Sequence, residues 1–353
     1  MMNRNALKIF LSGILIGSTL FAGTVRSHGT AGATQLLIPV GAENIAVSLA
    51  NVATVAGVEA LWQNPAGAAK HKGGFQVLAS SMSYLADINV ANFGIIYNTG
   101  KLGTFGAHFK NLDFGDIPVT TATETEGTGN NFSPTFSTIG LGYSKSFSDR
   151  VQFGADFKLV TEKIMNTSAR GYAVDLGVQY QFPDIPLHIG VVLKNLGSRM
   201  EYTGTNLEQT VDLEGVSSGT TTERVRLKSE SFAIPSAFDI SLNYEVIKDL
   251  MLLAAFKNNS YSSNTGSFAA KYSFMGMGWV AGGYQLDLVN NSDQPSDVSD
   301  DDWKLQTQNV WGFTFGAGVA VPVGGLKVGI GYSFRQVTDY FENNNLFQLT
   351  VDF

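Results

Sequence analysis

The chain has 353 residues, of which 15% are charged, against about 25% in ordinary soluble domains. Its net charge of -7 and the lack of a basic stripe exclude a nucleic-acid partner. There is no cysteine, which excludes disulfides and a lipid-anchored cysteine. Glycine is abundant, at 39 residues, and proline is scarce, at 9; a water-facing surface would normally carry more charge than this chain has.

Residues 1–28 predict a secretory signal peptide. Arg4 and Lys8 precede the apolar stretch Ile9 to Phe21, and small and polar residues follow it. The stretch is too short to span a membrane as a helix, and it has too little polar face for the alternative, a first core helix. We expect cleavage between Ala22 and Gly29.

Residues 29–73 lack strand alternation and predict a partly helical plug or hatch, inside or beneath the sheet that follows. Helical spacing is weak from Gly41 to Leu49, whereas LWQNPAGAAK contains a clear helix start. An Asn side chain can cap free amides, and proline tolerates the first helical position. The best candidate functional motif is therefore Trp62, Asn64, Pro65 and Gly67, with simple filling of the lumen favoured over gating.

Residues 74–353 predict fourteen strands. The expected segments are 75–83, 88–97, 103–110, 137–147, 151–162, 172–182, 187–195, 234–244, 250–257, 267–274, 277–287, 310–321, 326–335 and 345–353. In the last of them Phe347, Leu349, Val351 and Phe353 alternate with Gln348, Thr350 and Asp352. Because one face is bulky and apolar while the other is small or polar, we predict an all-β, transmembrane antiparallel β-barrel in an outer membrane, with lipid outside. The terminal aromatic residue, Phe353, is the expected barrel-assembly signal.

Loop lengths give a second indication of a barrel. Short connections, such as 148–150 and 322–325, alternate with long ones, such as 111–136 and 196–233. Barrels of this kind join strands by short turns on the periplasmic side and by long loops outside. The chain should therefore enter the first strand and leave the last strand on the short-turn side.

Several charged residues fall on the face opposite the apolar one. They are Asp156, Lys158, Asp175, Lys194 and Asp239, with His108 and Lys110 in the same set. Charges at such positions are tolerable only when they are wet or paired. Since both signs are mixed, ordinary solvation of the lumen is favoured over a selectivity filter.

The search for catalytic, cofactor and metal motifs is negative. GVSSG places Ser217 in a nucleophile position, but the motif lies among polar loop residues and lacks the strand and helix that it needs. The acidic loop Ser296 to Asp302 could bind calcium, but its spacing does not match an EF-hand loop. We expect no enzyme activity, no cofactor and no metal.

At NPAG, and over nearly the whole chain after the predicted signal peptide, the sequence resembles the PorV/PorQ family, which is itself similar to FadL-type fatty acid transporters. The resemblance rests on GAENIAVSLANVATVAGVEALWQNPAG, FGDIPVTTATETEGTG, LKNLGSRMEYTG and FAIPSAFDISLNYEV, in this order. One departure is Glu43, an acidic residue where the family has a basic one.

The resemblance implies a fourteen-stranded outer-membrane barrel with an amino-terminal plug. For PorV-like members it further implies type IX secretion, in which the outer face receives secreted cargo proteins from the translocon and passes them to the attachment complex. The alternative is a FadL-like transporter of hydrophobic small molecules. That function needs an apolar pocket with a few polar anchors, whereas the strands predict a lumen of glycine, serine, threonine and charge.

Overall fold

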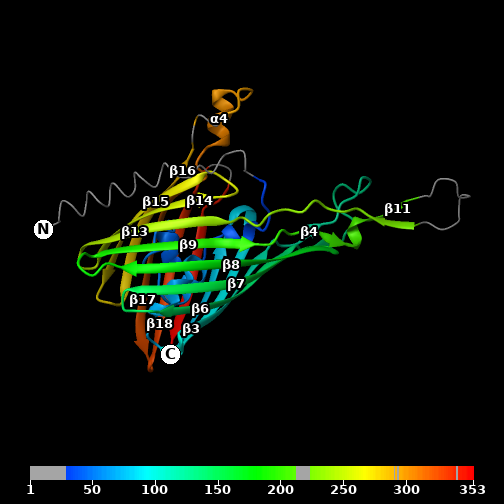
Figure 1. Ribbon diagram of the computed structural model, residues 1–353. Coiled ribbons are helices and arrows are strands. Elements are labelled where there is room, and N and C mark those ends of the chain that lie inside the picture. The colour runs from blue at the N-terminus through cyan, green and yellow to red at the C-terminus, as the bar shows by residue number, and fades with distance from the viewer. Residues whose placement is uncertain (1–28, 212–222, 290, 292–293, 339–340) are drawn as a thin grey trace, which may run out of the picture.

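The computed structural model describes residues 29–211, 223–289, 291, 294–338 and 341–353 (Figure 1). The predicted signal peptide, residues 1–28, and the Ser217 motif lie outside the described residues.

The wall of the molecule is an antiparallel barrel of fourteen strands in the described part of the chain. The first seven are β1 (Phe75–Ser83), β2 (Asn89–Asn98), β3 (Thr104–Asp113), β6 (Thr135–Ser146), β7 (Val151–Ile164), β8 (Thr167–Gln181) and β9 (Leu187–Gly197). The other seven are β13 (Ala237–Ile247), β14 (Leu250–Asn259), β15 (Asn264–Phe274), β16 (Gly278–Leu288), β17 (Trp311–Val323), β18 (Leu326–Val337) and β19 (Asn344–Asp352). The predicted fold class is confirmed.

The barrel closes between its first and last strands. β1 pairs with β19 from Gln76 opposite Asp352 to Ser83 opposite Asn345. Just beyond this ladder, the Gly74 amide donates to the carbonyl of Phe353 at 3.2 Å. No wall strand is left with an open edge, since β8 also pairs with β9.

Side chains alternate across the wall as the sequence predicts. Phe347 and Ile330 are 63% and 62% exposed on the exterior, whereas the neighbouring Gln348 and Gly331 are buried inside. An exterior of exposed aliphatic and aromatic side chains is favourable only against hydrocarbon. The protein is therefore an integral barrel of the outer membrane.

The connections identify the two ends of the barrel. Tight turns join strands at the inner end, such as the β17–β18 turn, where Gly324 and Gly325 adopt φ of 58° and 90°. At the outer end, long loops carry the small hairpins β4 (Ile117–Pro118) with β5 (Asn131–Phe132), and β11 (Glu208–Val211) with β12 (Glu223–Arg226) (Figure 1). Nearby, β10 (Thr203–Gly204) pairs with the outer end of β8.

One outer connection is shorter than predicted. The expected strands end at residue 162 and resume at 172, but β7 and β8 continue to Ile164 and from Thr167. The extra residues include Lys163 and Arg170, whose outward charges interrupt the apolar alternation and conceal the strand.

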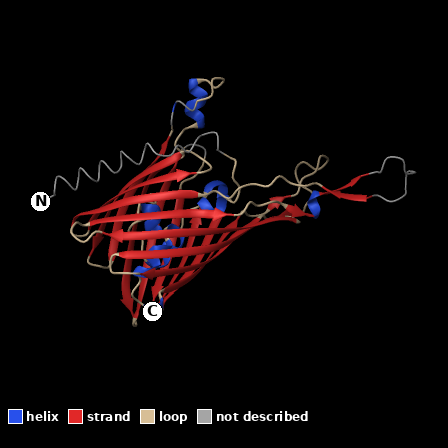
Figure 2. Ribbon diagram, in the orientation of Figure 1, coloured by secondary structure: helices blue, strands red, loops and turns tan. Residues whose placement is uncertain are grey.

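Short helices lie mainly in the amino-terminal segment, within the barrel (Figure 2). They are η2 (Thr34–Leu37), α2 (Ala42–Ala46), η3 (Gly57–Glu59), α3 (Ala60–Gln63) and η4 (Pro65–Lys70). Elsewhere are η5 (Leu85–Asp87), η6 (Gly100–Leu102), η7 (Thr205–Leu207) and α4 (Asp300–Gln306). No helix in the described ranges is long and apolar enough to cross a membrane.

Candidate functional site: a plugged lumen with two cavities

The amino-terminal segment, here called the plug (residues 29–74), crosses the whole lumen. At the outer end Ala31 forms a parallel bridge with Ala233, and the Gly32 amide donates to the Ala233 carbonyl at 3.1 Å. At the inner end the plug enters β1 beside Phe353. Any solute that passes through the barrel must therefore pass the plug.

Helix α2 is docked on β16 to β19. A Cβ atom on Gly331 would lie 2.8 Å from the Ala42 Cβ, and one on Gly316 would lie 2.8 Å from the Ala46 Cβ. The Ala42 amide donates to Gln348 Oε1 at 2.8 Å. Glycine in the wall thus allows the helix to approach closely, and one wall side chain fixes its first turn.

The NPAG motif fastens the other half of the plug. Asn64 Oδ1 accepts from the Ala66 amide at 3.2 Å, and its Nδ2 donates to the carbonyls of Val52 and Val178 at 2.9 and 3.2 Å. Pro65 occupies the first position of η4, in agreement with the predicted helix start. Asn64 therefore links two turns of the plug to the wall.

The remaining motif residues pack rather than react. A Cβ on Gly67 would lie 2.1 Å from the Val55 carbonyl oxygen, so no larger residue fits. The Trp62 and His108 rings lie 5.0 Å apart at 57°. These contacts give the motif a docking role, while gating remains a proposal.

The predicted luminal charges are buried and paired. His108 Nε2 lies 2.9 Å from Asp156 Oδ2, which belongs to a strand 48 residues further along the chain. Lys194 Nζ lies 3.4 Å from Asp239 Oδ2 and 3.1 Å from Gln63 Oε1 of the plug. Both arrangements compensate the desolvation of the buried charges.

Asp175 holds an irregular point in the wall. The β8–β9 register shifts between Val174 and Leu176, and Asn195 adopts a left-handed φ of 55°. Asp175 accepts from the Asn195 amide at 2.7 Å and from Lys158 Nζ at 2.5 Å. This carboxylate thus neutralises one lysine and satisfies the free amide of the bulge.

Lys110 ties the wall to the plug. Its Nζ donates to the carbonyls of Gln35 and Ile38, at 3.1 and 2.5 Å. Backbone oxygens of the plug therefore supply the polar contacts that this buried cation requires.

A cavity of about 370 Å³, here called the outer cavity, lies between the plug and the outer end of the barrel. Much of its apolar lining comes from the plug, and the rest from residues at or beside the outer ends of strands; the residues are Leu37, Leu49 and Val52 in the first group and Tyr84, Val310 and Trp311 in the second. Arg335 stacks 3.7 Å over the Trp311 ring, and its Nη2 donates to Gln285 Oε1 at 3.1 Å. The apolar side chains share the cavity with the charged residues Asp239, Lys257 and Asp287 and with several Ser, Thr and Asn side chains, so its surface is amphipathic.

The space narrows to about 40 Å³ next to the outer cavity. Leu37, Leu49 and Lys257 line both spaces, and Trp62 and Lys194 line the narrow one. The outer cavity therefore ends at the middle of the plug.

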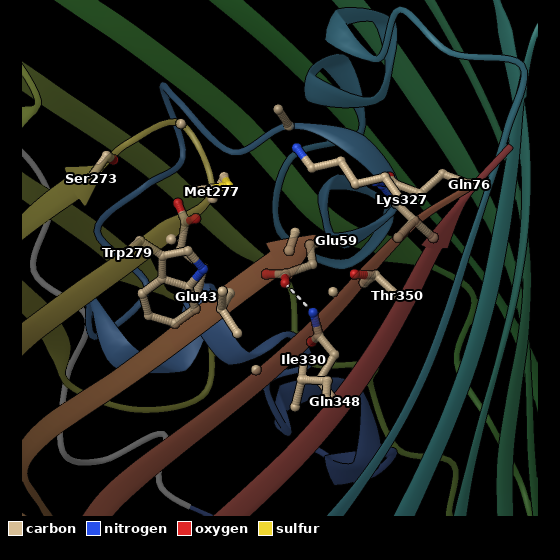
Figure 3. A pocket seen from close by; sticks show the side chains of 18 of the residues that line it. Glu43, Glu59, Gln76, Ser273, Met277, Trp279, Lys327, Ile330, Gln348 and Thr350 are labelled. Carbon is tan, nitrogen blue, oxygen red and sulfur yellow. Dashed lines mark hydrogen bonds between the residues drawn. The ribbon is translucent and has the colours of Figure 1, made fainter. Parts of the chain in front are cut away.

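A second cavity of about 370 Å³, here called the inner cavity, lies between the plug and β15 to β19 (Figure 3). Glu43 forms an ion pair with Lys271 of the wall at 2.6 Å, so this acidic residue of the plug has a basic partner. Gln348 Nε2 donates to Glu59 Oε1 at 2.5 Å, and Glu59 Oε2 has no partner among the described residues. Burial, together with repulsion from Glu43, raises the pKa of Glu59 to about 7.

Sequence reasoning missed the groups that form the two cavities. Arg335 and Lys257 lie on luminal faces of their strands, so the alternation that identified Asp239 could also have identified them. Glu59 and Trp311 carry no such signal, because one is in the plug and the other at a strand end. Within the described ranges, no group of three or more His, Asp or Glu residues is arranged to hold a metal ion.

Solved structures share this architecture. The Pseudomonas putida toluene transporter TodX matches over 89% of this chain and 97% of its own, with a TM-score of 0.53 and 12% identity. The chain has a FadL-type outer-membrane barrel fold. CymD, a monoaromatic hydrocarbon channel, matches over 92% of this chain and 98% of its own, with a TM-score of 0.51 and 10% identity. A Pseudomonas aeruginosa FadL homologue matches over 89% and 98%, with a TM-score of 0.47 and 12% identity.

No protein-family model matches the chain, and no curated protein matches it in sequence. At 10 to 12% identity TodX and CymD establish the fold, and neither is described as a PorV or PorQ protein.

Proposed function

We propose that the protein is a channel for small hydrophobic or amphipathic molecules across the outer membrane. The observation that carries this proposal is the pair of cavities on opposite sides of one plug, each of about 370 Å³. Such a volume suits a molecule of one or two rings or a short chain, and lies within the range of small-molecule sites.

The outer cavity combines apolar and polar surface, which suits an amphipathic solute. Its apolar surface comes from the plug residues Leu37, Leu49 and Val52 and from Trp311 at the outer end of β17. Strand alternation alone gives a polar lumen, which argued against transport. That argument is weakened because the plug adds apolar side chains where the strands supply mostly polar ones.

The fold adds support of a general kind. TodX is described as a toluene transporter and CymD as a monoaromatic hydrocarbon channel, and both share this barrel architecture. A solute would enter the outer cavity, pass the narrow space beside Trp62 when the plug shifts, and leave through the inner cavity.

Filling the outer cavity tests the proposal. Ala255 lines the cavity from β14, so Ala255→Trp should occupy it, while Ala270→Trp places the same side chain on the exposed face of β15. Cells that express each variant are given radiolabelled toluene or palmitate. We expect uptake to fall to the empty-vector level only for A255W. Uptake of neither probe by the parent protein, or equal uptake by a correctly assembled A255W, would overturn the proposal.

A second candidate function is the binding of secreted proteins during type IX secretion, as the PorV/PorQ resemblance implies. The β4–β5 and β11–β12 hairpins project far beyond the outer rim and offer a surface for contact with another protein (Figure 1). Co-purification tests this candidate. Translocon, attachment-complex or cargo proteins should accompany the intact barrel and be lost when residues 117–132 are deleted. Their absence from the intact barrel would rule it out.

A further inference from the structure

The exterior of β7 and β8 carries a basic pair at its outer end. Lys163 and Arg170 are both exposed, and the register places Lys163 opposite Ser168 and Arg170 opposite Thr161. The two basic residues are therefore diagonal neighbours across one strand pair, with Cα atoms about 7–8 Å apart. One phosphate group can contact both of their long side chains.

The basic pair lies at the level expected for lipid headgroups. Phe153, near the inner end of β7, is ten residues before Lys163 on the same exterior face. At about 3.4 Å per residue and a tilt of roughly 40°, ten residues rise about 26 Å, close to the ~25 Å height of an apolar barrel belt. Lys163 and Arg170 thus meet the outer border of the membrane.

Below the basic pair is an aromatic surface suited to acyl chains. Phe157 and Tyr172 are 47% and 56% exposed, and their rings stack 5.8 Å apart at 24°. A third basic residue, Arg199, is exposed beside them, since the preceding Ser198 amide donates to the Tyr172 carbonyl at 3.0 Å. Arg199 is held in place by Ser231, whose Oγ accepts from its Nε at 2.9 Å.

The outward positions of β7 and β8 themselves carry no acidic residue. Glu201, two residues before the Thr203 that pairs with Ser168, falls beside Arg170 in the neighbouring segment, so the basic residues of this face are partly compensated. The outward positions of β7 are Val151, Phe153, Ala155, Phe157, Leu159, Thr161 and Lys163. Those of β8 are Ser168, Arg170, Tyr172, Val174, Leu176, Val178 and Tyr180. The acidic residues of the two strands, Asp156, Glu162 and Asp175, all face the lumen and are buried.

We propose that this face is a binding site for a phosphate-bearing lipid of the outer leaflet. Arg170 and Lys163 contact the phosphate, with Arg199 at the margin, and the acyl chains lie on Phe157, Tyr172 and the aliphatic residues below. Arginine suits phosphate because its planar group donates two parallel hydrogen bonds. The site is on the outer wall and does not depend on what passes through the lumen.

Matched charge removals test the site. The double variant Lys163→Gln with Arg170→Gln is compared with Lys101→Gln with Lys145→Gln, which removes two basic residues from the inner end of the barrel. Each purified full-length barrel is titrated with lipid A, with dephosphorylated lipid A and with inorganic phosphate, and bound lipid is measured by native mass spectrometry. Heat-modified electrophoretic mobility confirms that both variants are folded.

We expect K163Q/R170Q to weaken lipid A binding roughly 10- to 100-fold, as loss of charged hydrogen bonds implies, and K101Q/K145Q to leave it unchanged. The parent barrel should prefer lipid A to its dephosphorylated form by a similar factor. Equal weakening by both double variants would show attraction to net charge only, and would overturn the proposal. Equal binding of dephosphorylated lipid, or tighter binding of inorganic phosphate, would also overturn it.

Discussion

Replacing Glu59 by glutamine should abolish a pH dependence of plug docking. Glu59 lies where the plug meets β19, and burial raises its pKa from 4.5 to about 7. The difference between these two values, at ~1.36 kcal/mol per pH unit, amounts to roughly 3 kcal/mol. Glutamine retains the oxygen that accepts from Gln348 but cannot ionise.

The direction of this pH dependence follows from the difference in proton binding between the docked and the displaced plug. The docked plug holds the Glu59 proton more tightly than a displaced plug, in which the carboxyl regains its ordinary pKa in water. Docking is therefore most stable below pH 4.5, loses stability as the pH rises towards 7, and changes little above that. Since repulsion from Glu43 contributes to the raised pKa, Glu43→Gln should narrow this pH range.

Hydrogen exchange of residues 42–60 measures the docking free energy directly. Exchange is recorded at pH 5 and pH 8 in the folded barrel and corrected for the intrinsic pH dependence of amide exchange. The parent plug should open more readily at pH 8, by up to about 3 kcal/mol, whereas E59Q should show the same opening free energy at both values. An equal pH effect in the parent and in E59Q would refute the assignment of the raised pKa to this carboxyl.

Three further substitutions probe the wall and the plug. Phe315→Arg, on the lipid face of β17, should reduce the free energy of folding into lipid by roughly 2–4 kcal/mol, measured by urea titration in vesicles. Asp175→Asn leaves Lys158 buried without its counter-charge and should cost about 3–5 kcal/mol in the same titration; a change below 1 kcal/mol would mean that water reaches the lysine. Gly154→Val places a Cβ about 2.3 Å from the Ala66 nitrogen, so the plug should become protease-sensitive while the barrel stays folded. A protected plug in G154V would contradict the close approach.

The outer cavity changes how the chain should be interpreted. From the strands alone, the lumen is polar, and protein secretion is the leading function. The apolar plug residues Leu37, Leu49 and Val52 support the transport proposal, because they add apolar surface to a cavity whose wall side chains are mostly polar. The two candidate functions now depend on different parts of the molecule, the lumen and the projecting loops, and can be tested separately.

The sequence alone determined the wall of this protein. Every predicted strand overlaps a wall strand, and β1 matches its predicted range from 75 to 83. Alternation also placed Asp156 and Lys158 inside and Phe347 outside. A strand that separates lipid from a narrow lumen must change environment at every residue, so the pattern is local and can be recognised without a partner strand.

Only the tertiary structure decided the interior. Gln348 and Glu59 are 289 residues apart in the sequence, and His108 and Asp156 are 48 residues apart. No periodicity in the chain therefore predicts either contact. The cavities exist because the irregular plug meets the wall in some places and leaves space in others. That outcome depends on the sum of many non-local contacts, whereas the wall depends on a two-residue repeat.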